Sequence, residues 1–253
     1  MIIDIHVHEG KSLFGYEFDI QKLLDNMQKI GIDRAVLHPL KPYNYHFEPE
    51  NTRISEIVKK YPDKFQAFGR IDPWRKDNAL AEIKRIFEDL NFMGIFLHPM
   101  EEQFSLTSPV LKPVLSLLKE YKKPVMVSGG HVRVSHPRQI EYLAGEYPDI
   151  TFIATSGGQI NISGMMLTEA EAMLTNRPNV YMETSGIYRR DFIERMTIKL
   201  GAERILFGSG VPYYDQAFEL ERIKTADITN EEKGSILGRN TARMLTPLNI
   251  AVK

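Results

Sequence analysis

The sequence predicts a single α/β domain, a (β/α)8 barrel, spanning residues 1–253. Eight short apolar runs alternate with eight or so helical segments, which is the order that this barrel requires. The apolar runs are continuous, as expected of parallel strands that are buried on both faces. Polar side chains stand where many of these runs end, and the active sites of barrel enzymes form at that rim.

The predicted strands are short runs of β-branched, aromatic and other apolar residues that end at a polar side chain or a turn. In the first, Ile2, Ile3, Ile5 and Val7 leave almost no helical character. The predicted strands cover residues 2–7, 34–39, 65–73, 92–99, 123–131 with its turn, 150–155, 179–186 and 204–212.

The segments between the strands carry apolar residues at helical spacing. In the first of them Ile20, Leu23, Met27 and Ile30 share one face, and Gly31 ends the helix. The predicted helices cover residues 18–30, 49–61, 78–90, 109–121, 137–147, 165–176, 190–200, 217–223 and 230–245. A doubly wound open sheet is the alternative, but no Gly-x-Gly-x-x-Gly motif follows the first strand.

Composition excludes several classes of protein. The net charge of −1 gives no electrostatic reason to bind nucleic acid or an anionic membrane. The chain has no cysteine, so any metal must use other ligands. Neither a long apolar run nor a basic leader is present, so we expect a cytoplasmic protein with a small-molecule substrate. The sequence leaves a homo-oligomer open.

His6 and His8 are the first candidate ligands, because alternate residues of a strand project to the same side. Two imidazoles so placed can hold one metal ion. The alternative is that both rings simply pack or hydrogen-bond. Their place at the carboxyl end of a buried strand favours the metal site.

Six segments carry a resemblance to a known family: DIHVH at 4–8, GIFLHP at 94–99, the glycine pair at 157–158, NVYMETSG at 179–186, ILFGSGVP at 205–212 and GRNTARML at 238–245. Together they resemble the amidohydrolase-related TIM-barrel family of metal-dependent hydrolases and of decarboxylases of the aminocarboxymuconate-semialdehyde type. The resemblance implies a metal held by the His pair, a His ending strand five, sometimes a His ending strand six, and an Asp ending strand eight that takes the proton of the bound water.

The sequence departs from that pattern at three positions. Ser128, Thr155 and Gly210 stand where the resemblance implies two histidines and the aspartate. His131, beyond a Gly-Gly hinge, is the candidate third ligand beside His6 and His8. A site with two histidines and no carboxylate predicts a divalent ion, zinc by preference, bound weakly, in part, or not at all.

Two residues are candidates for the catalytic role. Glu183 ends strand seven and is the best-placed carboxylate; its alternative role is a rim partner for Arg189 or Arg190. His98 ends strand four, where it is either catalytic or a rim residue.

Further side chains near the strand ends are candidates for substrate binding, with the arginines able to bind an acidic group. For Asp72, which precedes a proline, capping the next turn is the alternative. These candidates are Arg70, Asp72, Ser128, Tyr188, Arg189 and Tyr213.

These observations favour a divergent metal-dependent hydrolase that acts on a small carboxylate or on a cyclic amide or ester. The alternatives are a related non-oxidative decarboxylase and a catalytically degenerate barrel that binds a small molecule or a partner. The fold cannot decide among them, because this barrel carries many activities.

Overall fold

The structure is a computed structural model that describes residues 1–159 and 166–246. Its sheet has nine strands in the order β2-β1-β3-β4-β5-β6-β7-β8-β9, and all neighbours are parallel except β1 and β2. The predicted parallel barrel is confirmed, and β2 is an added hairpin arm. The strands are β1 (Ile3–Lys11), β2 (Glu17–Phe18), β3 (Arg34–Pro39), β4 (Phe65–Arg70), β5 (Gly94–Leu97), β6 (Val125–Val127), β7 (Phe152–Ala154), β8 (Val180–Glu183) and β9 (Ile205–Leu206).

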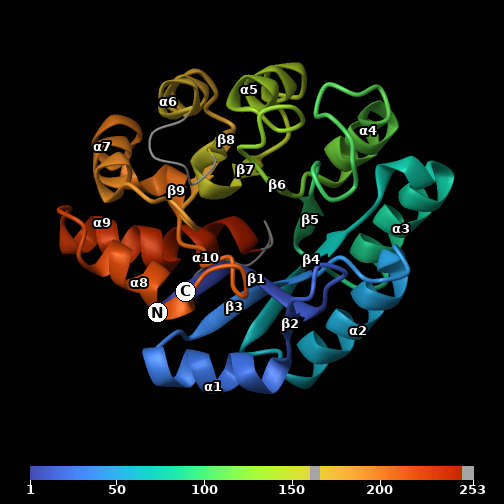
Figure 1. The fold of residues 1–253 in the computed structure, drawn as a ribbon, viewed down its shortest axis with the longest axis horizontal. Coiled ribbons are helices and arrows are strands. Elements are labelled where there is room, and N and C mark those ends of the chain that lie inside the picture. Colours follow the sequence, from blue (N-terminus) through green and yellow to red (C-terminus); the bar gives the residue numbers. More distant parts are fainter. Residues whose placement is uncertain (160–165, 247–253) are drawn as a thin grey trace.

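Helices surround the strands on the outside of the barrel (Figure 1). The α-helices are α1 (Ile20–Ile30), α2 (Phe47–Lys60), α3 (Asp77–Glu88), α4 (Leu111–Tyr121), α5 (Pro137–Glu146), α6 (Leu167–Asn176), α7 (Arg190–Leu200), α8 (Gln216–Lys224), α9 (Asn230–Gly234) and α10 (Asn240–Leu245). Short 3-10 turns are η1 (Pro73–Arg75), η2 (Thr155–Gly158) and η3 (Ala202–Arg204), and η4 (Ser235–Arg239) is a π-helical turn. The last predicted helix is thus divided into three parts. The predicted start of the sixth helix, Met165, lies outside the described residues.

The sheet closes between β9 and β1, which rules out the open-sheet alternative. Ile5 donates its N–H to the Phe207 carbonyl at 3.0 Å, and His8 donates to the Val211 carbonyl at 2.8 Å. In the opposite direction, Gly210 N–H donates to the His6 carbonyl at 2.7 Å. The segment after β9 therefore continues the parallel pairing up to the end of the first strand.

Two apolar clusters form the core, one inside the barrel and one between the strands and the helices. The inner cluster takes side chains from seven of the parallel strands and one from α10: Ile5, Val36, Phe68, Phe96, Met126, Ile153, Leu206 and Leu245. The barrel interior is therefore packed rather than hollow, and Leu245 of α10 contributes to that packing.

A bulge in β1 turns the histidine pair toward the interior. Between Asp4 and Val7 the register of β1 against β3 shifts, and β1 gains one residue. As a result Ile5 packs in the inner cluster while His6, its neighbour, also lines the interior. His38 donates its Nε2–H to the Ile5 carbonyl at 2.9 Å and so satisfies an acceptor at the bulge.

Within residues 1–159 and 166–246, no helix combines the length and the apolar character that crossing a membrane requires. The cytoplasmic location and the homo-oligomer stay predictions.

Candidate active site

A cavity of about 560 Å³ lies at the carboxyl ends of the strands. Most of its exposed lining is apolar, and aromatic rings and histidines dominate it. The described lining residues are His6, His8, Phe14, Tyr16, Phe96, His98, Met100, Glu101, Ser128, Gly129, Thr155, Ser156, Gln159, Ser185, Tyr213 and Tyr214. A concave site with a few convergent polar groups is the usual form of a small-molecule site.

His6 and His8 meet on the wall of this cavity, with their Nε2 atoms 3.0 Å apart. Both side chains are buried. Burial lowers the pKa of His8 well below its usual value, and the neighbouring His6 and His38 lower it further. His8 is therefore neutral at pH 7, and its Nδ1 atom finds no hydrogen-bond partner among the described residues.

Glu183 lies behind His6 rather than on the cavity wall. Its Oε2 atom is 3.4 Å from Nδ1 of His6, and it accepts hydrogen bonds from the Ser185 hydroxyl at 2.8 Å and the Ser156 N–H at 3.1 Å. The Ser185 hydroxyl is also 3.2 Å from Nδ1 of His6. A carboxylate in this place favours a proton on Nδ1 and leaves the Nε2 lone pair of His6 facing His8. Glu183 can thus act only through His6.

The rim partnership considered for Glu183 does not form. Arg189 pairs with Asp191 at 2.6 Å, and Arg190 pairs with Glu194 at 3.0 Å. Both arginines lie on the surface.

Two glycines after β9 make room for neighbouring side chains. A Cβ atom on Gly208 would collide with the Glu183 carboxylate. Gly210 has φ +66°, and a Cβ atom there would lie 2.9 Å from the Tyr214 ring and 3.2 Å from Cβ of Ser185. Tyr214 therefore fills the space that a larger side chain at position 210 would enter.

Glu101, in the loop after β5, brings a carboxylate to the cavity wall. Its Oε1 atom accepts a hydrogen bond from the Tyr213 hydroxyl at 3.3 Å and lies 3.7 Å from Nε2 of His98. His98 accepts the Glu101 N–H through Nδ1 at 3.1 Å, so its ring proton sits on Nε2. Burial, together with Arg70, lowers the pKa of His98 to about 3. His98 is therefore a neutral donor that faces Glu101.

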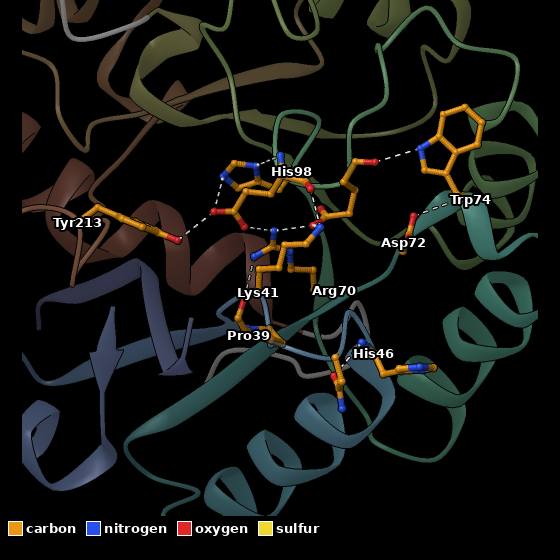
Figure 2. A network of polar contacts seen from close by, with 11 residues as sticks. Pro39, Lys41, His46, Arg70, Asp72, Trp74, His98 and Tyr213 are labelled. Carbon is orange, nitrogen blue, oxygen red and sulfur yellow. Dashed lines mark hydrogen bonds and ion pairs between the residues drawn. The ribbon is translucent and has the colours of Figure 1, made fainter. Parts of the chain in front are cut away.

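Arg70 holds Glu101 from the far side (Figure 2). Its guanidinium donates to Oε2 of Glu101 and, at 2.8 Å, to Oε1 of Glu102, which also lies 3.3 Å from Nζ of Lys41. Arg70 is fully buried and is absent from the described lining of the cavity. Two carboxylates of its own chain take up the charge of Arg70, and its role in substrate binding stays a prediction.

Three other predicted substrate-binding residues lie away from the cavity. Asp72 accepts the Trp74 N–H at 3.0 Å and caps η1, which is the alternative considered for it. Tyr188 and Arg189 line a separate surface depression beside α7 and α8, and Tyr188 is 72% exposed. Of the six predictions, the structure brings only Ser128 and Tyr213 to the cavity wall.

The predicted three-histidine metal site does not form. His131 is not among the described lining residues, and its N–H is fixed to the Ser135 hydroxyl at 3.2 Å. In residues 1–159 and 166–246, no three His, Cys, Asp or Glu side chains are arranged to hold a metal ion. His6 and His8 supply two nitrogen ligands, whereas catalytic metal sites usually take at least three from the protein. The residues present do not fit the metal site that the resemblance implies.

The sequence model of the amidohydrolase family matches residues 3–246. This chain belongs to the amidohydrolase family. No curated protein matched the sequence. Ser128, Thr155 and Gly210 are the positions at which the sequence departs from the pattern that the resemblance implies.

Solved structures share the barrel fold of this chain. A 2,6-dihydroxybenzoate decarboxylase bound to 2,6-dihydroxybenzoate superimposes with a TM-score of 0.79 at 15% identity, covering 97% of this chain and 98% of the other. A dihydroxybenzoic acid decarboxylase from a Polaromonas species, with bound manganese and 2-nitroresorcinol, gives 0.77 at 15% identity over 99% and 98%. A 4-oxalomesaconate hydratase from Rhodopseudomonas palustris gives 0.70 at 19% identity over 97% and 95%. Identities this low establish the fold alone.

Sequence reasoning missed Glu101 and Ser185 as wall residues. Glu101 follows the sequence His-Pro-Met in a loop, where no periodicity marks it, and its partner Arg70 is distant in the chain. Ser185 carried a usable signal, because it lies two residues beyond Glu183 at the same strand end.

Proposed function

We propose that this protein is a small-molecule hydrolase that cleaves a cyclic amide or ester, with the His6–His8 pair as its acid and base. The observation that carries the proposal is the 3.0 Å approach of the two Nε2 atoms on the cavity wall, with the Glu183 carboxylate 3.4 Å from Nδ1 of His6. Such a carboxylate–imidazole pair is a recurrent device for general acid–base catalysis.

The chemistry follows from the protons that the pair can hold. With Nδ1 of His6 protonated toward Glu183, Nε2 of His6 accepts the hydrogen bond from His8, and a water molecule that replaces His8 as its partner can give its proton to Nε2 as it attacks the substrate carbonyl. The resulting imidazolium faces the Glu183 carboxylate, which stabilises its charge. The same proton then passes to the leaving nitrogen or oxygen.

Tyr214 is the candidate donor to the carbonyl oxygen. Tyr214 lines the cavity, and its ring lies close to Ser185 beside Gly210. Burial raises the pKa of Tyr214, with Glu183 and Glu219 adding to the effect, so the hydroxyl keeps its proton at neutral pH. A phenol that stays protonated can donate a hydrogen bond to developing negative charge.

A divalent ion, zinc included, is proposed to bind this pair weakly at most. The same pair could instead protonate a ring carbon during non-oxidative decarboxylation, and the aromatic lining of the cavity favours that second candidate. Both reactions need His6 and His8.

The test is an assay of the purified protein against a panel of lactones, cyclic imides and hydroxybenzoates, with and without chelator. We expect turnover of a lactone or imide that survives the chelator. His6→Asn and His8→Asn should each lower kcat/KM by about 10²–10⁴-fold. His46→Asn, at a histidine outside the cavity, is the matched control and should leave the rate unchanged.

Turnover of hydroxybenzoates alone would favour the decarboxylase. If the His6→Asn and His8→Asn variants each kept the rate of the wild type, the pair would be removed from the mechanism. The absence of any turnover would favour the binding-protein alternative.

A further inference from the structure

Formal charge is unevenly distributed around the cavity. Among the described residues that line it, Glu101 is the single Asp, Glu, Lys or Arg. Arg70 pairs with Glu101 and Glu102, Lys41 pairs with Glu102, and neither cation is among the described lining residues. The four charges balance in number, but the negative end of the network faces the cavity.

The cavity-facing oxygen of Glu101 is underused as an acceptor. Its contacts are 3.3 Å to the Tyr213 hydroxyl and 3.7 Å to Nε2 of His98. Hydroxyl-to-carboxylate bonds are usually about 2.6 Å long and interactions beyond about 3.5 Å are not hydrogen bonds. Oε1 therefore retains acceptor capacity for a donor in the cavity, while Oε2 is held by Arg70.

The histidine that faces Glu101 does not supply positive charge. His98 is neutral at pH 7, since burial lowers its pKa. The surrounding aromatic rings present faces and edges rather than charges: Tyr213 packs against Tyr16 at 4.7 Å and against His8 at 5.0 Å between ring centroids. Aromatic faces attract cations and repel anions.

We propose that this cavity takes substrates that present an N–H group to Oε1 of Glu101, as an amine, amidine or amide, and discriminates against carboxylates. The inference rests on the proposed function only in placing the substrate in this cavity. A preference for N–H groups would distinguish this protein from the structural neighbours that are named for benzoates. Of the two substrate classes proposed above, cyclic amides and cyclic esters, it favours the cyclic amides.

The test is calorimetric titration of the wild-type protein with four probes of one shape: benzylamine, benzamide, benzyl alcohol and benzoate. At pH 7 we expect benzylamine to bind at least tenfold more tightly than benzoate, with benzamide between them. Benzoate binding as tightly as benzylamine would overturn the proposal without any variant.

Glu101→Gln should weaken benzylamine binding at least tenfold and leave benzyl alcohol within twofold. Glu102→Gln is the matched control, because it removes the same charge from the same arginine but does not lie on the cavity wall. It should leave benzylamine binding within threefold. Equal losses in the two variants would show a long-range charge effect and would overturn the assignment to Glu101.

These outcomes are independent of the His pair. If the probes bind in the predicted order but the protein has no hydrolase activity, the proposed function is wrong and the proposed substrate class stands. If His6→Asn abolishes a measured hydrolysis but benzoate binds best, the proposed function stands and the substrate class is wrong.

Discussion

Gly210 occupies the position at which the family resemblance implies an aspartate, and its surroundings explain why the replacement is not a simple loss. Its φ of +66° lies in the left-handed region, where side chains are strained. The Tyr214 ring already fills the adjacent space. The resemblance implies an aspartate at this position, whereas the structure predicts that an aspartate side chain would not fit here.

Gly210→Asp should therefore destabilise the protein rather than tighten metal binding. Gly15→Asp is the matched control, since Gly15 also has positive φ, at +85°, but open space around it. We expect Gly210→Asp to cost about 1–3 kcal/mol more than the control, from overpacking against Tyr214. Urea denaturation of both variants measures the difference, and equal costs would show that the ring moves aside freely.

Glu183→Gln should abolish turnover with a moderate loss of stability. The carboxylate accepts from the Ser185 N–H at 2.7 Å, the Ser185 hydroxyl at 2.8 Å and the Ser156 N–H at 3.1 Å. A glutamine has one acceptor oxygen, so one donor loses its partner at a cost of about 1–3 kcal/mol. Denaturation and steady-state kinetics separate the two effects. A folded variant with unchanged kcat would remove Glu183 from the mechanism.

The site residues that could be predicted from the sequence are those whose partners lie close to them along the chain. His6 and His8 were predictable because the pattern is local to one strand. The place of Arg70 was not, because its partners Glu101 and Glu102 come from another loop. A basic residue at a strand end looks the same in sequence whether it faces the cavity or a carboxylate of its own chain.

At the scale of elements, β4 and the loop after β5 are joined by buried charges. Arg70, at the end of β4, is fully buried and donates to Glu101 and Glu102 in that loop. Its guanidinium also lies 4.8 Å from the centroid of the Phe47 ring, which belongs to α2. One side chain thus fixes the loop that carries the cavity-facing carboxylate.

Arg70→Met should cost about 3–5 kcal/mol, because it leaves two buried carboxylates with only Lys41 nearby. Arg189→Met is the comparison: Arg189 pairs with Asp191 at 2.6 Å, and both side chains are about half exposed. For such an exposed pair we expect only a small loss of stability. Thermal denaturation of both variants tests the contrast, and similar shifts in Tm would mean that the Arg70 network contributes no more than a surface pair.

The elements themselves were largely predictable, and their exceptions have identifiable causes. The continuous apolar runs predicted all eight parallel strands, because burial on both faces dictates their composition. The bulge in β1 was not predictable, because it is defined by pairing with β3 rather than by residue type. The division of the last helix at η4 likewise left no mark in its apolar spacing.

At the scale of the whole molecule, metal content is the most direct check on the donor set. We expect protein purified without chelator to contain less than one zinc per chain, lost on dialysis, because His6 and His8 alone supply two ligands. Elemental analysis before and after dialysis measures this. A stoichiometric metal that resists the chelator would show that a further ligand joins the pair.

Stability should also depend on pH through Glu219, which accepts the Gly186 N–H at 3.0 Å and pairs with Arg222 at 2.9 Å. Burial raises the pKa of Glu219 from 4.5 to about 7. The pKa of Glu219 is higher in the folded protein than in the unfolded chain, so its contribution to the free energy of unfolding is fully present below about pH 4.5 and is lost as pH rises through about 7. The loss is about 3 kcal/mol at most.

Glu219→Gln should remove that part of the pH dependence. Urea denaturation at several pH values between 5 and 8 compares the variant with the wild type. An identical fall in stability in both proteins would exclude Glu219 as its source.

The packing of Leu245 into the inner cluster has a consequence for kinetics. With the barrel interior filled by these side chains, the space for a ligand among the described residues lies at the strand ends. Substrate and product must then occupy the same cavity in turn. A product that lingers there excludes the next substrate molecule, so inhibition by product will be competitive, and the departure of product can set the pace of the whole cycle.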